Sequence, residues 1–376
     1  MRTVCLLGQD IRHSLSPLLH NGAFRALGLD WTYVLAPVAA DLAAAVRGLQ
    51  ALGFAGANVT MPYKQAVLGY LDDVDDLARL VGAVNTIVVQ PDGRLLGRNS
   101  DVGGFSTTLA AHGIDASARP ARVVGAGGAA RAVVFALAAA GCPAITVVNR
   151  TQARALRLVE EARAVWPGTR WQVLRWPEQI AADLPPDALI VNCTCVGAAG
   201  SPVAGRMPWP QDAAFGPGHA VLDLVYAPRQ PPLLAKARRD GAALVLDGTE
   251  PLARQAAISS GWWTGRPPPV EHMLAALAEH PAEPEEVIER LRGRIDGVDV
   301  ALLDVIARRM ALVDELGRHK AELGSSVASA EREAEVHHRW RAVADELGLP
   351  RGLARTILDA LLEESRRRQR AARGEG

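Results

Sequence analysis

The chain has 376 residues, which is enough for two or three domains. Lysine plus arginine and aspartate plus glutamate both number 41, so no overall field favours nucleic acid or an anionic membrane as a partner. No apolar run approaches the ~20 residues of a membrane span, and no signal peptide precedes the first strand-like segment. Four cysteines are too few for a disulfide framework. We expect a soluble, cytoplasmic protein.

The pair Cys193-x-Cys195 does not have the spacing of a zinc site. Positions two apart on a strand face the same side, so both cysteines are expected to be small core residues. We predict no metal site.

Residues 1 to about 102 alternate strand-like and helix-like segments, a pattern that predicts an α/β layer with a mixed sheet. The expected strands are Val4–Gly8, Trp31–Ala36, Ala57–Thr60 and Thr86–Gln90, and the expected helices are Pro17–Leu27, Asp41–Leu52 and one that begins at Lys64.

Polar clusters interrupt this segment at residues 14–17, 58–64 and 97–101. Taken singly, each has a plain explanation. Ser14 and Ser16 suit the start of a helix before Pro17, Lys64 could be an ordinary exposed lysine, and Asp101 could cap the helix that follows.

The stretch from Arg122 to Thr151 reads as a strand, a glycine turn, a helix and a second strand. Its spacing is Gly125-x-Gly127-x-x-Ala130. In such a unit the first glycine permits the tight turn, the second lets backbone approach a pyrophosphate, and the small third residue allows close helix–strand packing. The free amides at the helix N-terminus favour phosphate. This stretch therefore predicts dinucleotide binding.

The residues after the second strand select the cofactor. An NAD-binding unit places a carboxylate there for the ribose hydroxyls, whereas this chain has Asn149, Arg150 and Thr151, with Arg154 one turn later. Two cations and no carboxylate suit a 2′-phosphate, so NADP is the predicted cofactor.

Strands are expected near Trp171–Leu174, Ala188–Cys193, Ala220–Val225 and Ala243–Leu246, which makes residues 103–248 a Rossmann-type nucleotide domain. A helix over Pro251–Ser260 then returns the chain to the first domain. That domain would be discontinuous, comprising residues 1–102 and 249–280, with a cleft between the two domains.

Together these motifs resemble shikimate dehydrogenase over roughly residues 1 to 277. The motifs occur in the family order and spacing: Ser14-x-Ser16-Pro17, Asn58-Val59-Thr60-x-Pro62-x-Lys64, Val84-Asn85-Thr86, Asn99-Ser100-Asp101, Gly125-x-Gly127-Gly128-x-x-Arg131, Asn149-Arg150-Thr151, Asn192-Cys193-Thr194, Asp223-Leu224-Val225-Tyr226 and Gln255-Ala256-Ala257.

The resemblance implies a role for each matching position. Lys64 and Asp101 would be the catalytic pair, and Ser14 and Ser16 would bind the substrate carboxylate, with Tyr226 nearby. The ring hydroxyls would be held by Thr60, Asn85, Asp101 and Gln255. The cofactor would be lined by Asp76, Gly125, Ala126, Gly127, Gly128, Ala129, Asn149, Arg150, Thr151, Arg154, Thr194, Leu224 and Gly248.

Three positions depart from the family pattern. Ser100 stands for a usual threonine, Ala198 for a usual methionine, and Glu250-Pro251 for a Gly/Met-type run. These departures leave quinate or an amino-shikimate open as the substrate.

From Glu285 the composition changes to a charged segment without strand pattern, after a linker at 281–284. Apolar residues keep helical spacing from residue 287 to 316, and helices are expected over Ser329–Leu347 and Pro350–Arg370. Three helices, the first too long for so small a domain, predict an intertwined homodimer.

This segment resembles the all-helical class of chorismate mutase, with Ser329 where an aspartate is common. The resemblance implies that Arg292 and Arg309 clamp the two substrate carboxylates with help from Ser365. Lys320 and Gln369 would donate to the ether oxygen and would be the catalytic residues. The ring hydroxyl would be held by Arg332 and Glu333.

Arg292 and Lys320 are 28 residues apart on one expected helix, about 42 Å at 1.5 Å per residue. No chorismate-sized ligand spans that distance, so Arg292 would serve a site made mainly by the other subunit.

The sequence thus predicts a bifunctional enzyme of aromatic amino-acid biosynthesis that reduces 3-dehydroshikimate to shikimate with NADPH and rearranges chorismate to prephenate. Two alternatives stay open. The helical segment could be a non-catalytic dimeriser or sensor, or the two units could act on quinate-type and modified-chorismate substrates. The basic tail, Arg366–Arg373, carries no aromatic residues and is not expected to bind nucleic acid.

Overall fold

The computed structural model describes residues 2–199, 201, 203–279, 284–326 and 329–372; within these, the side chains of residues 278–279, 284–294, 296–297, 300–301 and 346 are left out. The chain divides into two compact units, residues 1–281 and residues 282–376. Each unit is described by itself below.

The first sheet of unit 1 is mixed, in the order β2-β1-β3-β5-β6-β4. Strands β2, β1 and β3 are parallel, β5 is antiparallel to β3 and β6, and β4 is parallel to β6. The mixed sheet is confirmed. Its strands are β1 (Arg2–Gly8), β2 (Trp31–Pro37), β3 (Gly56–Val59), β4 (Asp73–Val74), β5 (Thr86–Val89) and β6 (Leu95–Arg98), and its helices are α1 (Ser16–Ala26), α2 (Leu42–Ala51) and α3 (Asp76–Val81).

Three local predictions in this part were wrong or incomplete. No α-helix begins at Lys64, where a 3₁₀ helix over Ala66–Tyr70 follows instead. The Lys64 carbonyl accepts a hydrogen bond from the Val84 amide at 2.7 Å and cannot begin a helical ladder. The turn at Pro91–Gly93 leads into an unexpected strand, β6, because Gly93 adopts a φ of 86° and closes a hairpin. Helix α1 has Leu15 rather than a serine at its N-cap position, although Ser14 Oγ accepts a hydrogen bond from the Ser16 amide at 3.3 Å.

The second sheet is fully parallel, in the order β12-β11-β10-β7-β8-β9. Such a sheet is buried on both faces, and its strands accordingly carry runs of buried apolar residues. Its strands are β7 (Ala121–Val124), β8 (Ala144–Asn149), β9 (Arg170–Arg175), β10 (Leu189–Asn192), β11 (Ala220–Asp223) and β12 (Leu244–Leu246), and its helices are α5 (Gly128–Ala139), α6 (Gln152–Val165) and α7 (Pro232–Arg239).

The assignment of Cys193 and Cys195 to a strand was wrong, although Cys193 does pack against the hydrophobic core. Strand β10 ends at Asn192, and both cysteines lie in the loop beyond it, partly buried. A parallel strand that ends at the carboxyl edge of a sheet delivers its following loop to the ligand side.

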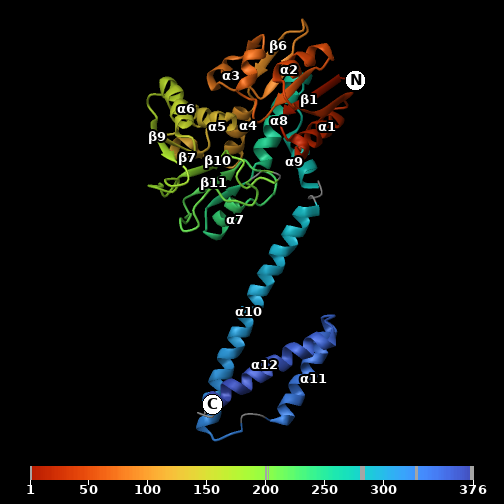
Figure 1. Cartoon of the computed structure of the whole chain (residues 1–376), viewed down its shortest axis with the longest axis vertical. Coiled ribbons are helices and arrows are strands. Elements are labelled where there is room, and N and C mark those ends of the chain that lie inside the picture. Colours follow the sequence, from red (N-terminus) through yellow and green to blue (C-terminus); the bar gives the residue numbers. More distant parts are fainter. Residues whose placement is uncertain (1, 200, 202, 280–283, 327–328, 373–376) are drawn as a thin grey trace. The chain divides into compact units, whose positions relative to one another are not determined.

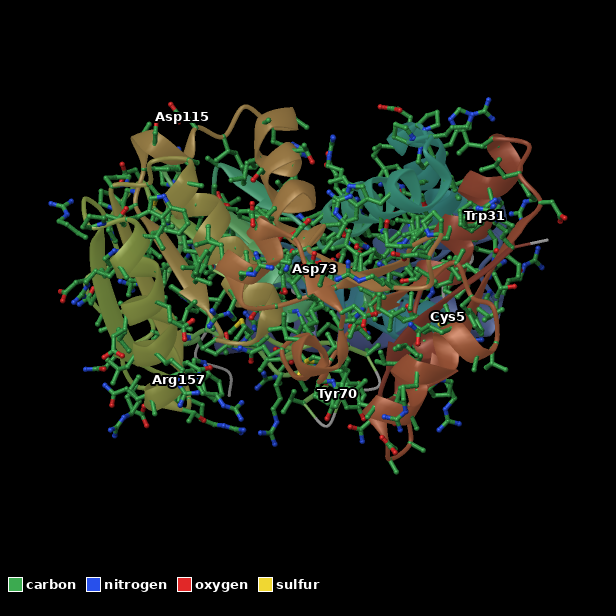
Figure 2. The ribbon with its side chains drawn as sticks, turned by 90° about the horizontal axis from the view of Figure 1, so that it is seen from above. Cys5, Trp31, Tyr70, Asp73, Asp115 and Arg157 are labelled. Atoms are coloured by element: carbon green, nitrogen blue, oxygen red, sulfur yellow. The ribbon has the colours of Figure 1, made fainter. Side chains whose placement is uncertain are left out.

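Two helices connect the sheets. Helices α4 (Asp101–Ala111) and α8 (Thr249–Thr264) lie side by side between the two sheets (Figure 1). Their close approach requires Gly104, since a Cβ there would lie 2.8 Å from the Gln255 amide nitrogen. Helix α9 (Val270–Glu279) follows. Figure 2 shows Asp115 and Arg157 on the part built on the second sheet, and Cys5 and Trp31 on the part built on the first.

Unit 2 consists of α10 (Pro284–Glu322), α11 (Ala330–Glu346) and α12 (Arg351–Ala371). The three-helix fold is confirmed. Ser329 caps α11 by accepting a hydrogen bond from the Arg332 amide at 3.4 Å. None of the described helices of the chain is long and apolar enough to cross a membrane.

Candidate active sites

Lys64 and Asp101 form an ion pair at the junction of the two sheets. Lys64 follows β3, and Asp101 opens α4 directly after β6. The Lys64 Nζ lies 2.5 Å from Asp101 Oδ2, and the two side chains are only 16% and 18% exposed. Lys64 is therefore not an ordinary exposed lysine. Asp101 is not a helix cap either, since the N-cap of α4 is Ser100, which makes no side-chain cap hydrogen bond.

Amide and hydroxyl side chains surround this pair. Asn85 donates to Asp101 Oδ1 at 2.7 Å, to Ser100 Oγ at 2.9 Å and to Gln255 Oε1 at 3.3 Å. Ser100 donates to the same Gln255 oxygen at 3.1 Å. Asn85 before β5, Asp101 at the start of α4 and Gln255 on α8 therefore meet at one point, and the Ser100 hydroxyl is part of it.

The serine cluster is a second group of polar side chains in unit 1. Ser14 Oγ donates to Ser16 Oγ at 3.1 Å. Burial raises the pKa of Tyr226 above its ordinary value, and the nearby Ser14 side chain acts in the opposite direction. Thr60 lies at the end of β3, where its methyl group leaves no room for a side chain at Gly8. These hydroxyls form a candidate site for a carboxylate.

The glycine turn lies directly against Lys64. Gly125 has a φ of +118°, which favours glycine, and α5 begins at Gly128 with Gly127 as N-cap. A Cβ on Gly128 would lie 2.9 Å from the Cβ of Lys64. The free amides of α5 and the Lys64 ammonium therefore belong to the same region.

The basic residues after β8 are positioned for an anion. Thr151 is the N-cap of α6, and Asn149 donates to its carbonyl at 2.9 Å. Arg150 and Arg154 are exposed, and neither guanidinium pairs with a carboxylate in the described part of the chain. Two unpaired cations beside the turn fit a 2′-phosphate.

The remaining residues predicted to line the cofactor differ in how closely they are packed. Thr194 packs on Gly125, and the Leu224 carbonyl packs on Gly248 so closely that neither glycine could carry a side chain without contact. Ala126 and Ala129 flank the turn and are partly exposed. Asp76 is exposed at the start of α3, where its carboxylate accepts a hydrogen bond from Arg79 at 3.1 Å.

In unit 2, Arg309 on α10 and Ser365 on α12 are in contact. Arg309 Nη1 donates to Ser365 Oγ at 2.8 Å, and burial lowers the pKa of Arg309 below its ordinary value. Gln369, one turn beyond Ser365, is 7% exposed, and its Oε1 has no hydrogen-bond partner among the described residues. A buried amide oxygen without a partner, one turn from the serine that Arg309 contacts, indicates a ligand site.

The other predicted residues of unit 2 are more dispersed. Glu333 on α11 accepts hydrogen bonds from Arg366 at 3.2 Å, whereas Arg332 pairs with Glu335 at 2.6 Å. Lys320 lies in the last turns of α10 and is partly buried. The side chain of Arg292 lies outside the described residues.

Comparison with known proteins identifies both units. Family models match residues 6–87 (shikimate dehydrogenase substrate binding domain), 108–169 (shikimate / quinate 5-dehydrogenase) and 248–278 (shikimate 5'-dehydrogenase C-terminal domain). The shikimate dehydrogenase (NADP(+)) of Moorella thermoacetica is 45% identical over 279 residues, which are 73% of this chain and 92% of that protein. The chain belongs to the shikimate dehydrogenase family. Residues 291–370 match the family model for chorismate mutase type II.

Solved structures agree with this assignment of the dehydrogenase unit. The shikimate 5-dehydrogenase of Thermus thermophilus, in complex with NADP(H) and shikimate, is 37% identical with a TM-score of 0.62, covering 73% of this chain and 98% of that one. A chorismate mutase/shikimate 5-dehydrogenase fusion protein from Clostridium acetobutylicum is 28% identical with a TM-score of 0.64, covering 74% of this chain and 98% of that one. The combination of the two enzyme families in one polypeptide therefore has a precedent.

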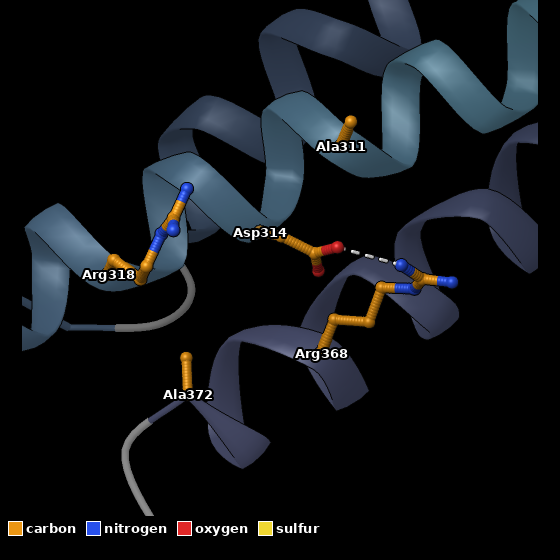
Figure 3. A pocket seen from close by; sticks show the side chains of 5 residues that line it. All are labelled: Ala311, Asp314, Arg318, Arg368 and Ala372. Carbon is orange, nitrogen blue, oxygen red and sulfur yellow. Dashed lines mark hydrogen bonds and ion pairs between the residues drawn. The ribbon is translucent and has the colours of Figure 1, made fainter.

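A hollow of the mutase unit lies between α10 and α12, and none of the predicted mutase residues lines it. Its volume is about 570 Å³, and Figure 3 shows its lining from α10 and α12: Ala311, Asp314, Arg318, Arg368 and Ala372. Arg368 pairs there with Asp314 at 2.9 Å and with Glu364 at 2.8 Å. Because two carboxylates already neutralise this arginine, we assign no ligand to the hollow.

Sequence reasoning missed several polar residues of both units. The pairing of Arg366 with Glu333 joins α12 to α11, and the hydrogen bonds of Ser100 depend on α8. The charge of Arg366 was visible in the sequence, but its partner lies 33 residues away. The described residues contain no group of three His, Cys, Asp or Glu that could hold a metal ion.

Proposed function

We propose that the dehydrogenase unit reduces 3-dehydroshikimate to shikimate with NADPH and that the mutase unit rearranges chorismate to prephenate. The observation that carries the first activity is the partly buried Lys64–Asp101 pair with Asn85 on its second carboxylate oxygen. The proposal treats residues 1–102 and 249–280 as the substrate domain and 103–248 as the NADP domain. Residues 281–284 serve as the linker and 285–376 as the mutase domain.

Lys64 acts on the oxygen of the reacting carbonyl in this proposal. NADPH, when bound, supplies the hydride. The Lys64 ammonium stabilises the developing alkoxide and gives it a proton, while Asp101 fixes the ammonium in place. Asn85 and Gln255 are close enough to the pair to hold the ring hydroxyls, with Thr60 beside them at the end of β3.

The carboxylate of the substrate would bind at Ser14, Ser16 and Tyr226. Ser14 donates a hydrogen bond to Ser16 and lies near Tyr226, so three hydroxyl groups are available to one carboxylate. A carboxylate accepts such hydrogen bonds strongly because it is charged.

NADP fits the residues at the carboxyl edge of the second sheet. The amides at Gly127–Ala129 would hold the pyrophosphate, and Arg150 and Arg154 would hold the 2′-phosphate with Asn149 and Thr151. Thr194, Leu224 and Gly248 lie just after the ends of β10, β11 and β12, which are neighbours in the sheet. We place them beside the nicotinamide half of the cofactor. Asp76 stays a prediction without a contact in its support.

The mutase reaction requires a protein that holds a dianion in a compact conformation and stabilises charge on the ether oxygen. Arg309 and Ser365 would bind one carboxylate, since they are already in contact. Gln369 and Lys320 would donate to the ether oxygen, and Arg332 and Glu333 would hold the ring hydroxyl. Arg292 would bind the other carboxylate.

A homodimer through the mutase unit would supply Arg292 to the site of the second copy. Helix α10 runs without a break from Pro284 to Glu322, so Arg292 and Lys320 of one chain are about 42 Å apart. Large apolar side chains also remain exposed on α10, among them Leu302, Leu303 and Leu312. Exposed apolar surface of this kind favours association.

Subunit complementation tests this arrangement. Arg292→Ala and Arg309→Ala chains would each lack mutase activity, whereas an equal mixture refolded together would regain about a quarter of it, because half of the dimers carry one intact site. No recovery in verified heterodimers would overturn the shared site.

A paired assay of the purified protein tests the two activities. NADPH oxidation is measured with 3-dehydroshikimate, and the disappearance of chorismate is measured separately. Initial rates with quinate and an amino-shikimate test the alternative substrates. A mutase assay on the full chain carrying Lys64→Ala tests whether the helical unit is catalytic or only a dimeriser.

We also propose that the protein is located in the cytoplasm. All four cysteines are free, as is usual for proteins of the reducing cytoplasm.

A further inference from the structure

A buried polar pair closes the carboxyl edge of the second sheet beside the proposed dehydrogenase site. Asn192 ends β10 and Asp223 ends β11, and the two residues are direct partners in the parallel register. Both are 0% exposed. Neither belongs to the groups assigned above to substrate or cofactor.

The pair holds the loops that follow both strands. Asn192 Oδ1 accepts from the Thr194 amide at 3.0 Å and from the Thr194 hydroxyl at 2.7 Å. Asn192 Nδ2 donates to Asp223 Oδ1 at 2.8 Å. That same oxygen accepts from the Val225 amide at 3.0 Å. A continuous chain of hydrogen bonds therefore runs from Thr194 to Val225.

Each end of this chain reaches a different ligand position. Thr194 packs against the glycine turn, since a Cβ on Gly125 would lie 3.3 Å from Thr194 Cγ2. Val225 immediately precedes Tyr226, which lies near Ser14. The first end thus touches the proposed nucleotide site and the second the proposed carboxylate site.

A carboxyl group buried at position 223 destabilises the folded protein. Its second oxygen, Oδ2, is buried without a hydrogen-bond partner among the described residues, and an unpaired buried polar group destabilises the folded state. Burial raises the pKa of Asp223 to about 7, with the nearby Asp247 acting in the same direction. Cys193, in the loop after β10, faces it as well, and burial raises the pKa of that thiol. An apolar residue would avoid the cost but could not accept the two hydrogen bonds.

We propose that Asp223 is a positioning residue that, through Asn192, keeps the nucleotide loop at Thr194 and the substrate loop at Tyr226 in a fixed relative position. The inference rests on the proposed dehydrogenase function. It differs from a purely structural role because loss of the carboxyl oxygen should weaken both ligands at once.

Kinetics of full-length variants test the inference. Asp223→Ala is expected to raise KM for shikimate and for NADP⁺ each by roughly tenfold, the effect of losing about 1.4 kcal/mol of positioning. Asp223→Asn keeps an acceptor oxygen at the Oδ1 position, so both KM values should return to within about threefold of the wild type. If Asp223→Ala is not recovered folded, Asn192→Ala breaks the same chain and should raise both KM values.

His219→Ala is a matched control. His219 precedes β11 at the opposite edge of the sheet, is 6% exposed, and makes two hydrogen bonds of 2.9 Å, with the Gly216 amide and the Pro185 carbonyl. Its loss should lower Tm and leave both KM values unchanged. The inference is overturned if Asp223→Ala behaves like His219→Ala, or if Asn does not rescue.

Failure of the proposed function would look different. If the wild-type protein oxidises quinate instead of shikimate, the same KM comparison is made with quinate. If it oxidises neither, the proposed function fails, and NADPH binding measured by fluorescence still decides the cofactor half: unchanged affinity in Asp223→Ala overturns the inference.

Discussion

The dehydrogenase site and the mutase site both serve carboxylate ligands, yet they are constructed differently. In the dehydrogenase unit, loops at the ends of strands from two sheets bring Lys64, Asp101 and Asn85 into direct contact within one chain. In the mutase unit, Arg309 and Ser365 touch, and the proposed partner Arg292 is placed far along the same helix as Arg309.

The difference follows from how each secondary structure spaces its residues. Parallel strands end at a common edge, so residues distant in sequence converge there. A helix separates its residues by about 1.5 Å each along one axis, so one long helix cannot surround a small ligand. We therefore expect the dehydrogenase site to be complete in one chain and the mutase site to require two.

Substitution of Lys64 should give the largest effect. Lys64→Ala is expected to lower kcat for shikimate oxidation by ~10²-fold or more, since a positioned acid or base contributes on that scale. Chorismate turnover by the same preparation should be unchanged. Lys320→Ala is the matched control: it should lower chorismate turnover and leave shikimate oxidation unchanged. A near-normal kcat in Lys64→Ala would remove Lys64 from its proposed role.

Arg309→Ala should abolish mutase activity and spare the dehydrogenase, because the guanidinium that contacts Ser365 is lost. The neighbouring Arg308 is exposed and pairs only locally with Asp304, so Arg308→Ala should retain mutase activity. Loss of both activities in Arg309→Ala would instead indicate a folding defect, which circular dichroism and gel filtration would reveal.

Gly128→Ala tests how closely the nucleotide turn and Lys64 depend on each other. The new methyl group would lie 2.9 Å from the Lys64 Cβ, so one of the two must move. A small displacement of a catalytic group can cost up to ~10²-fold, and we expect kcat to fall by roughly tenfold. Gly48→Ala on α2 is the control, because a Cβ there meets nothing within 4 Å and Gly48 has no proposed role in binding. Equal effects of the two substitutions would argue against the contact.

The last prediction concerns stability and pH rather than turnover. Because the pKa of Asp223 is raised from 3.8 to about 7 in the folded state, the folded chain binds the proton more tightly. Its contribution is complete below pH ~4 and is lost as pH rises toward 7. The loss is at most about 4 kcal/mol, at 1.36 kcal/mol per pKa unit.

Asp223→Asn does not titrate, so its free energy of unfolding should gain on that of the wild type between pH 4 and pH 7. Urea unfolding of both proteins at several pH values measures the difference. A constant difference across this range would show that Asp223 does not change its protonation on folding.

Local patterns in the sequence were sufficient for much of the fold. The run from Arg122 to Thr151 predicted a strand, a turn and a helix that β7 and α5 confirm, because hydrophobic periodicity and glycine act over a few residues. The helical spacing after Glu285 likewise predicted α10. The cations after β8 were visible for the same reason.

Only the tertiary structure decided which polar groups meet. The Val84 amide, 20 residues away, donates a hydrogen bond to the Lys64 carbonyl, and the expected helix does not form there. Asn192 and Asp223 become partners because β10 and β11 are neighbours in the sheet, and Ser100 reaches Gln255 because α4 packs on α8. The hydrophobic periodicity of a segment indicates only which of its faces is buried. The pairing of buried polar groups depends on which segments become neighbours, and that is determined only when the whole core is formed.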